Sequence, residues 1–355
     1  MKILITGGCG FLGSNLASYF LNNKNQVYII DSLERKGALI NLNWLKSQSG
    51  NQQLVFFKSD IVNTNAINSF FKQNAPFDFI CHVAGQVAMT TSINNPRKDF
   101  ETNALGTFNI LESAREFSPK SLIAYSSTNK VYGDLDWVET IEDDKRYKYK
   151  NEIYKNGLAE NIPLDFTTPY GCSKGSADQY VKDWAKVYGM KTVIFRHSSI
   201  YGGRQFASEN QGWIGWFCLK ALEQKIATTN NKEIKPFTIS GTGKQVRDVL
   251  HAKDLVDLYY CAYKNKEYLN GEIFNIGGGY KNSLSLIELF DFLKNELSLI
   301  ELKFTKIKRR ISDQDCFVAD INKSKKILNW SPTISYKQGI REMISWSKNI
   351  LESEK

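Results

Sequence analysis

The chain has 355 residues, 42% of them hydrophobic, 13% aromatic and 23% charged, a composition that excludes a disordered or low-complexity protein. No apolar run approaches the ~18 residues of a membrane span, and the six cysteines are scattered without a CxxC pair, so we expect a cytoplasmic protein in a reducing compartment. The net charge of +9 is compatible with nucleic acid, with small polyanionic ligands or with a lysine-rich exterior.

Short β-rich runs alternate with helical stretches through the N-terminal half. The expected strands are residues 3–6, 26–30, 54–58, 77–82, 122–126 and 191–196. Helical spacing covers residues 11–22 and 103–117. Strands that alternate with helices predict a doubly wound parallel sheet, with the carboxyl ends of its strands along one ligand-binding edge. We therefore expect an α/β Rossmann fold with a smaller C-terminal α/β lobe.

Two domains follow from this pattern. We expect the Rossmann domain to span residues 1–190, completed by roughly 191–200 and 235–262, and the rest of 200–355 to form mainly a substrate lobe. A charged excursion at 134–161 interrupts the first domain. A solvated loop is its simplest interpretation, and a lid or a subunit contact is the alternative.

A glycine-rich turn follows the first expected strand and opens the first helix. Its GxxGxxG spacing places Gly7 at a tight turn, lets backbone N–H groups approach a diphosphate at Gly10, and allows close helix packing at Gly13. An ordinary strand-to-helix turn is the alternative. Asp31 ends the second strand, where a carboxylate accepts hydrogen bonds from a ribose diol and repels a 2′-phosphate. NAD is thus favoured over NADP, although Arg35 is close enough to partner a phosphate.

Tyr170 and Lys174 stand four residues apart, so on a helix they share one face. A free phenol has a pKa of ~10, and a nearby ammonium and the positive nicotinamide both lower it. Tyr170 is then able to take a proton from a substrate hydroxyl as hydride leaves the same carbon. Thr128, at the end of the fifth strand, is the best candidate to hydrogen-bond the reacting oxygen. The Tyr–Lys pair alone is equally compatible with a surface helix.

Together these motifs resemble the extended short-chain dehydrogenase/reductases that modify nucleotide sugars, over nearly the whole chain. Shorter matches are Asp60-Ile61, HVAG (82–85), NALGT (103–107) and SSTNKVYG (126–133). Longer runs are similar to the CDP-tyvelose epimerase (CDP-paratose 2-epimerase) branch: GQVAMTTSI (85–93), SSTNKVYGD (126–134), YGCSKGSADQY (170–180), FRHSSIYGGRQF (195–206), NQGWIGWF (210–217), SGTGKQVRDVLH (240–251) and SDQDCFVAD (312–320). Residues 139–161 depart from that pattern.

The resemblance implies an NAD-dependent isomerase that epimerises C2 of a CDP-linked hexose through a 2-keto intermediate, with hydride returned to the opposite face. The catalytic residues that it implies are Thr128, Tyr170 and Lys174. The implied cofactor contacts are Gly7, Gly10, Phe11, Leu12, Gly13, Asp31, Asp60, Ile61, Ala84, Asn103, Tyr170 and Lys174. The implied substrate contacts are Gln86, Thr128, Asn129, His197, Arg204, Arg247 and Arg310. Polysaccharide biosynthesis is the implied setting.

Several alternatives stay open. The scaffold is also compatible with C2-epimerisation of CDP-glucose, a C4-epimerase, a 4,6-dehydratase, or a non-catalytic NAD-binding or RNA-associated protein. A dehydratase typically carries an acidic pair after the catalytic threonine, where this chain has Asn129-Lys130. Arg247 suits a phosphate through its planar fork, or pairs with Asp248. His197 and His251 lack metal-ligand spacing, so we expect no metal.

The chain's one basic concentration lies at residues 303–310. No aromatic ladder accompanies it, so we interpret it as a solvated face that includes one substrate arginine. We therefore expect a CDP-sugar as substrate, no nucleic acid and no membrane partner. The resemblance also implies a homo-oligomer, a dimer or tetramer that pairs through helices at 103–117 and 170–188.

Overall fold

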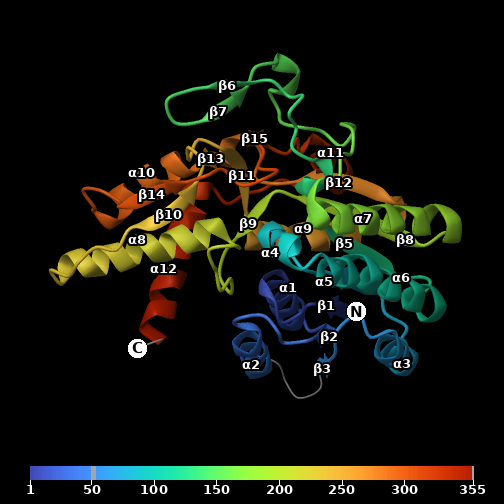
Figure 1. Ribbon diagram of the computed structural model, residues 1–355. Coiled ribbons are helices and arrows are strands. Elements are labelled where there is room, and N and C mark those ends of the chain that lie inside the picture. Colours follow the sequence, from blue (N-terminus) through green and yellow to red (C-terminus); the bar gives the residue numbers. More distant parts are fainter. Residues whose placement is uncertain (49–52, 354–355) are drawn as a thin grey trace.

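Seven parallel strands form the central sheet of the structure, a computed structural model that describes residues 1–48 and 53–353 (Figure 1). In spatial order they are β12 (Glu272–Ile276), β8 (Lys191–His197), β5 (Leu122–Thr128), β4 (Phe79–His82), β1 (Lys2–Thr6), β2 (Gln26–Asp31) and β3 (Leu54–Lys58). The strand order reverses between β1 and β4, which is the position where such sheets bind ligands. The predicted doubly wound Rossmann fold is confirmed.

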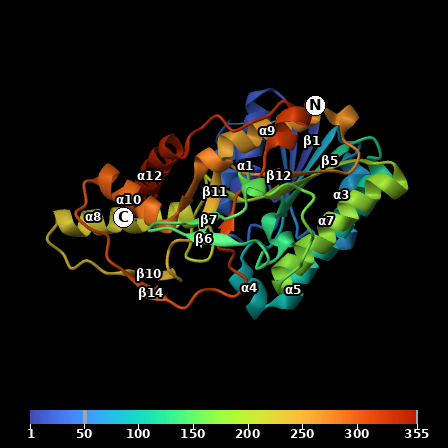
Figure 2. The same cartoon turned by 90° about the horizontal axis from the view of Figure 1, so that it is seen from above.

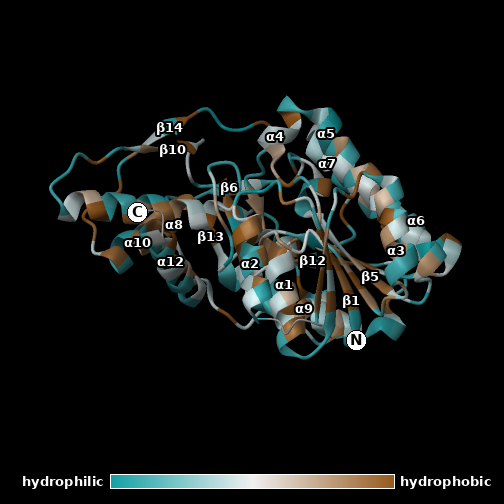
Figure 3. Cartoon of the chain, turned by 90° about the horizontal axis from the view of Figure 1, so that it is seen from below, coloured by the Kyte–Doolittle hydropathy of each residue, from teal (hydrophilic) through white to brown (hydrophobic). Residues whose placement is uncertain are grey.

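Helices cover both faces of this sheet, as Figure 2 shows from above. One face packs against α1 (Phe11–Asn22), α2 (Ala38–Gln48) and α9 (Ala252–Lys264), and the other against α3 (Thr64–Asn74), α6 (Gly106–Phe117) and α7 (Thr168–Tyr188). The inner strands are apolar along their length because both of their faces are buried (Figure 3). The sheet is therefore the rigid base on which the cleft is built.

Two elements differ from their expected bounds. The helix expected from residue 103 begins as an α-helix only at Gly106, because Glu101–Leu105 form a wider π-helical turn. Such turns are rare and frequent at functional sites. The seventh strand, β12, lies outside the segments 191–200 and 235–262 that were expected to complete the first domain, whereas α9 lies inside them.

The second lobe lies beside the sheet edge and has its own aromatic core, with Phe217, Phe237 and Phe290 at its centre. Its larger elements are α8 (Trp213–Thr229), α10 (Leu286–Leu297), α12 (Tyr336–Ser353), β10 (Phe237–Ser240), β11 (Val246–His251) and β14 (Phe304–Ile307). Short strands and helices complete the chain: α4 (Met89–Asn94), α5 (Pro96–Phe100), β6 (Thr140–Glu142), β7 (Tyr147–Tyr149), β9 (Ser199–Tyr201), β13 (Ser283–Ser285), β15 (Cys316–Phe317) and α11 (Asn322–Leu328).

The charged excursion forms a hairpin of β6 and β7 above the second lobe (Figure 1). Lys145 pairs with Asp291 at 2.7 Å, and Arg146 pairs with Glu288 at 3.3 Å. The backbone of the hairpin also bonds to the second lobe, since Tyr147 N donates a hydrogen bond to the Lys244 carbonyl at 3.0 Å. The segment is largely exposed, as expected for a solvated loop, but it forms a hairpin that long-range ion pairs attach to the second lobe, which sequence spacing does not reveal.

A buried ion pair joins α7 to the sheet. Arg196 on β8 donates to both carboxylate oxygens of Asp178, at 3.0 and 2.8 Å, and both side chains are almost fully buried. Ser127 on β5 donates to the same carboxylate at 2.7 Å. Arg196 also donates to the Tyr132 hydroxyl, which donates in turn to Asn275 on β12. One network thus connects three strands and the helix that carries the Tyr–Lys pair.

Replacing Arg196 by methionine (Arg196→Met) is expected to lower the free energy of unfolding by about 3–5 kcal/mol, because the Asp178 carboxylate would stay buried without its partner. Urea unfolding followed by tryptophan fluorescence measures this change. The matched control is Arg341→Met, which removes an exposed pair with Glu296 and should leave the unfolding curve close to wild type. A loss for Arg196→Met below about 1 kcal/mol would contradict the assigned role.

Candidate active site

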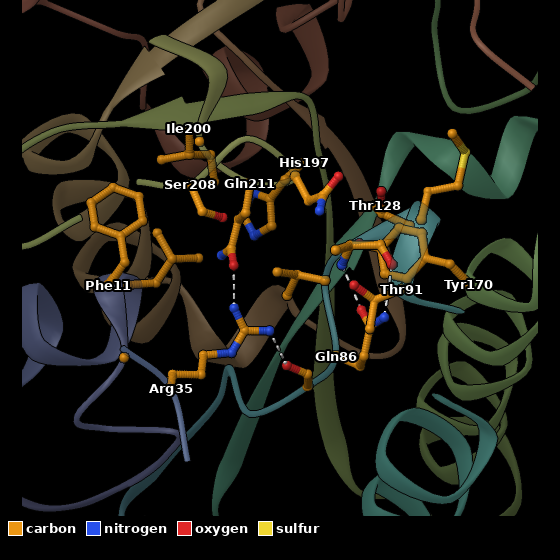
Figure 4. A pocket seen from close by; sticks show the side chains of 18 of the residues that line it. Phe11, Arg35, Gln86, Thr91, Thr128, Tyr170, His197, Ile200, Ser208 and Gln211 are labelled. Atoms are coloured by element: carbon orange, nitrogen blue, oxygen red, sulfur yellow. Dashed lines mark hydrogen bonds between the residues drawn. The ribbon is translucent and has the colours of Figure 1, made fainter. Parts of the chain in front are cut away.

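A cleft of about 820 Å³ lies between the lobes, at the carboxyl ends of the strands (Figure 4). It brings together seventeen of the residues predicted from the sequence. These are Gly7, Gly10, Phe11, Leu12, Gly13, Asp31, Asp60, Ile61, Ala84, Gln86, Thr128, Asn129, Tyr170, Lys174, His197, Arg247 and Arg310. Asn103 and Arg204 do not line it. The candidate site is therefore one continuous surface shared by both lobes.

The glycine turn leaves no room for side chains. Gly7 has a φ of +69°, and a Cβ there would lie 2.8 Å from the Ala84 Cα. A Cβ on Gly13 would lie 2.1 Å from the Gly7 carbonyl oxygen. The bare backbone and the start of α1 therefore fit a diphosphate. Asp31 stands beside the turn and accepts hydrogen bonds from the backbone N–H groups of Cys9 and Leu33, at 2.9 and 2.8 Å. The cradle and the carboxylate together fit a dinucleotide such as NAD.

Helix α7 presents Tyr170 and Lys174 to the cleft. A proline in its first turn and Gly189 in the left-handed conformation at its end define the helix. Burial raises the pKa of Tyr170 to about 12, although its hydrogen bond with Thr128 opposes this. Lys174 donates to the Ser126 carbonyl, and burial lowers the pKa of its ammonium to about 7. Among the protein's own groups, burial outweighs the two effects that lower the pKa of Tyr170, the hydrogen bond with Thr128 and the charge of Arg35. The lowering expected from the nicotinamide stays a prediction.

Asn103 positions the turn after β4 from behind the cleft. Its amide oxygen accepts from the Gln86 N–H at 2.8 Å, and its amide nitrogen lies 3.1 Å from the Gln86 carbonyl and 3.0 Å from the Ser173 hydroxyl. Asp99, which the sequence analysis missed, accepts from Ser173, and burial raises the pKa of its carboxyl. No spacing rule links Asp99 to the Tyr–Lys pair, because the contact depends on how α5 packs against α7.

Two of the arginines reach the substrate side of the cleft. Arg247 pairs with Asp313 at 2.7 Å and donates to the Gln314 carbonyl at 2.9 Å. The alternative partner, Asp248, is instead buried and accepts from two backbone N–H groups, and burial raises its pKa to about 6. Arg310 donates to the Glu209 carbonyl at 3.3 Å.

Arg204 corrects the sequence-based prediction of a substrate contact. Its guanidinium lies 3.7 Å from the centre of the Trp44 ring and 5.1 Å from that of Trp346. It therefore stacks between the two lobes outside the cleft and binds them to each other. The motif that contains Arg204 gives no sign of this, since Trp44 and Trp346 are remote in sequence.

His197 points into the cleft at the end of β8, beside Thr128 on the adjacent strand. Within residues 1–48 and 53–353, neither of its ring nitrogens has a hydrogen-bond partner. Burial, with a smaller effect of Lys174, lowers the pKa of its imidazole to about 3, so the ring is neutral at physiological pH. A neutral imidazole offers one donor and one acceptor to a ligand. His251 instead caps α9, and the described part of the chain holds no cluster of metal-binding side chains.

Comparison with known proteins gives a consistent result. A family model described as GDP-mannose 4,6 dehydratase matches residues 4–343. CDP-paratose 2-epimerase of Salmonella typhi is 52% identical over 350 residues, which cover 99% of this chain and 100% of that protein. dTDP-glucose 4,6-dehydratase 1 of Escherichia coli is 29% identical, over 98% of this chain and 92% of its own length.

Among solved structures, UDP-glucuronic acid 4-epimerase from Bacillus cereus, in complex with UDP-glucuronic acid and NAD, is 25% identical with a TM-score of 0.80. The match covers 99% of this chain and 100% of that one.

In the part of the chain that the structure describes, no helix is long and apolar enough to cross a membrane.

Acidification is expected to lower the free energy of unfolding through His82 and His197. Burial holds the pKa of each imidazole near 3 in the folded protein, against 6.5 for an ordinary histidine. Between these values the unfolded chain binds more protons than the folded one, so stability falls as the pH falls through this window. Urea unfolding at about pH 7, 6 and 5 tests this. His197→Gln should lose part of the pH dependence, and an unchanged slope in that variant would contradict the assignment.

Proposed function

Since this chain belongs to the GDP-mannose 4,6-dehydratase family, we propose that it is an NAD-dependent isomerase that inverts C2 of a CDP-linked hexose, as in the conversion of CDP-paratose to CDP-tyvelose. The observation that carries this proposal is the full-length similarity to the Salmonella typhi CDP-paratose 2-epimerase, far higher than that to the dehydratase. The cleft supports it with a dinucleotide cradle and a buried Tyr–Lys pair that share one surface.

Each catalytic residue has a distinct role in this proposal. Bound NAD supplies a hydride acceptor that also returns the hydride. Tyr170 takes the proton from the C2 hydroxyl as the C2 hydrogen leaves with its electron pair, which gives a 2-keto sugar. Thr128 donates a hydrogen bond to the reacting oxygen. Once the sugar has turned in the cleft to present the opposite face of C2 to the cofactor, Tyr170 would give the proton back to the oxygen. The ammonium of Lys174 stabilises the phenolate that this cycle needs.

On the substrate side we assign Arg247 and Arg310 to the diphosphate of the nucleotide sugar. Their planar guanidinium groups match pairs of phosphate oxygens, and both border the cleft on the second lobe. We assign Gln86, Asn129 and His197 to the sugar, because they line the same cleft as Thr128 and Tyr170.

The 4,6-dehydratase alternative finds less support in the residues after Thr128. The amide of Asn129 donates to Gln314 at 2.9 Å, and the ammonium of Lys130 donates to the Ser312 carbonyl at 2.8 Å. An amide and an ammonium therefore occupy the positions where a dehydratase carries its acidic pair. C2-epimerisation of CDP-glucose remains the alternative substrate assignment within the same chemistry.

The function is tested with CDP-paratose, CDP-glucose and UDP-glucose that carry deuterium at C2. We expect inversion at C2 of CDP-paratose by NMR, with the deuterium retained because the abstracted hydride returns to the same carbon. Tyr170→Phe should keep its NAD but lose about 100-fold or more of the turnover. NADH that accumulates in proportion to product would contradict the epimerase assignment. A 4-keto product formed from CDP-glucose or UDP-glucose with loss of the C6 hydroxyl would favour the dehydratase.

We also propose a cytoplasmic homo-oligomer. All six cysteines are free thiols, which fits a reducing compartment. Helices α6 and α7 lie side by side on one face of the sheet (Figure 1). Both expose apolar side chains. Phe108 is 36% exposed and Tyr180 45%, and both of their rings contact the largely buried Trp184. Val187, three residues further along α7, is 58% exposed. A contiguous apolar patch of this kind is typical of a protein interface.

Tyr180→Glu combined with Val187→Glu should convert the oligomer into a monomer, because two carboxylates would be buried without partners at the interface. Light scattering after gel filtration measures the mass. Tyr268→Glu, which changes an exposed tyrosine elsewhere on the surface, is the matched control and should not alter it. A wild-type chain that is monomeric at micromolar concentration would refute the oligomer.

A further inference from the structure

Arg35 crosses the cleft from one lobe to the other. It lies in the loop after β2, on the Rossmann side, and its Nη1 donates to the side chain of Gln211, just before α8 of the second lobe (Figure 4). Its Nη2 donates to the Gly85 carbonyl at 3.2 Å, after β4. One guanidinium is thus attached to both walls of the cleft, whereas the sequence showed Arg35 only as a cation close enough to Asp31 to partner a phosphate.

The position of this guanidinium along the cleft matches the middle of a dinucleotide. Arg35 lines the same cleft as Asp31, at the end of β2, and as Tyr170 on α7. A dinucleotide whose ribose meets Asp31 and whose reactive ring meets Tyr170 must pass its diphosphate between them. The glycine turn borders the same stretch of the cleft. A guanidinium has five N–H donors, so Arg35 keeps donors for phosphate oxygens while it holds Gly85 and Gln211.

The turn that carries Gln211 is firmly built. Ser208 and Gln211 exchange backbone hydrogen bonds of 2.9 and 3.0 Å, which close a tight loop. The chain just before it is fixed to both lobes, because Arg204 stacks between two tryptophans and Asn41 donates to the Arg204 carbonyl at 3.3 Å. Gln211 is therefore held in place on the second lobe by this turn, and Arg35 donates its hydrogen bond to it there.

We propose that Arg35 binds the diphosphate of NAD and, together with Gln211, forms a clasp between the lobes that holds the cofactor in place. NAD leaves only when Arg35 releases Gln211. This suits a reaction in which the hydride is returned in every cycle, because the cofactor need not exchange. The inference rests on NAD as the cofactor and is independent of which sugar is bound.

The test measures NADH release without any sugar, so the outcome does not depend on C2 epimerisation. Holoenzyme loaded with NADH is mixed with excess NAD, and the loss of energy transfer from tryptophan to bound NADH gives the dissociation rate. Arg35→Ala is expected to raise this rate by about 10- to 100-fold, since it removes a charge-assisted contact with the diphosphate. Gln211→Ala, which removes only the contact between the lobes, should raise it by about 5- to 10-fold.

Arg97→Ala is the matched control, since Arg97 is a surface arginine of α5 paired with Glu101, and it should release NADH at the wild-type rate. Arg35→Lys keeps the positive charge but loses the fork, so we expect an intermediate rate. A rate for Arg35→Ala within about twofold of wild type overturns the proposal. If Arg35→Ala is fast and Gln211→Ala is unchanged, the clasp between the lobes is overturned. If Arg35→Ala does not fold, Gln211→Ala and Arg35→Lys still decide the question.

Discussion

The ion pair between Asp178 and Arg196 is the constraint on which the site depends. Asp178 lies one helical turn beyond Lys174 on α7, and Arg196 directly precedes His197 on β8. Ser127, next to Thr128 on β5, donates to the same carboxylate. A pair buried this deeply contributes little net stability, because removing two charges from water costs about as much as their attraction returns. Its directional hydrogen bonds instead fix the position of α7 against two strands, and with it the reacting groups that these elements carry.

Burial controls the charges of those reacting groups. It raises the pKa of Tyr170, lowers that of Lys174 and keeps His82 and His197 neutral. Burial in the cleft thus disfavours the charged form of each of these groups. A positively charged nicotinamide beside Tyr170 would favour its phenolate. This arrangement keeps the tyrosine protonated until the cofactor is present, which suits a residue that must take and return the same proton.

The parts of the site that were predicted from the sequence are those encoded by neighbouring residues. The glycine turn, Asp31 and the Tyr170–Lys174 pair depend on local spacing, and each lies in the cleft as predicted. Asp99, the Arg35–Gln211 contact and the stacked Arg204 depend on side chains that come together only through packing, so no local pattern marks them. Strand β12 was not among the expected strands for a similar reason, since its place in the sheet follows from its pairing with β8.

The position of β12 also determines how the protein acquires its structure during synthesis. Residues 272–276 pair with β8 in the sheet. The side-chain oxygen of Asn275 also accepts a hydrogen bond from the Tyr132 hydroxyl, which belongs to the network around Arg196. Until this segment leaves the ribosome, β8 is an open edge strand whose backbone groups are available to other chains. The nascent first lobe therefore cannot close its sheet when its own N-terminal residues are complete. Its exposure to aggregation lasts until about half of the second lobe has been translated.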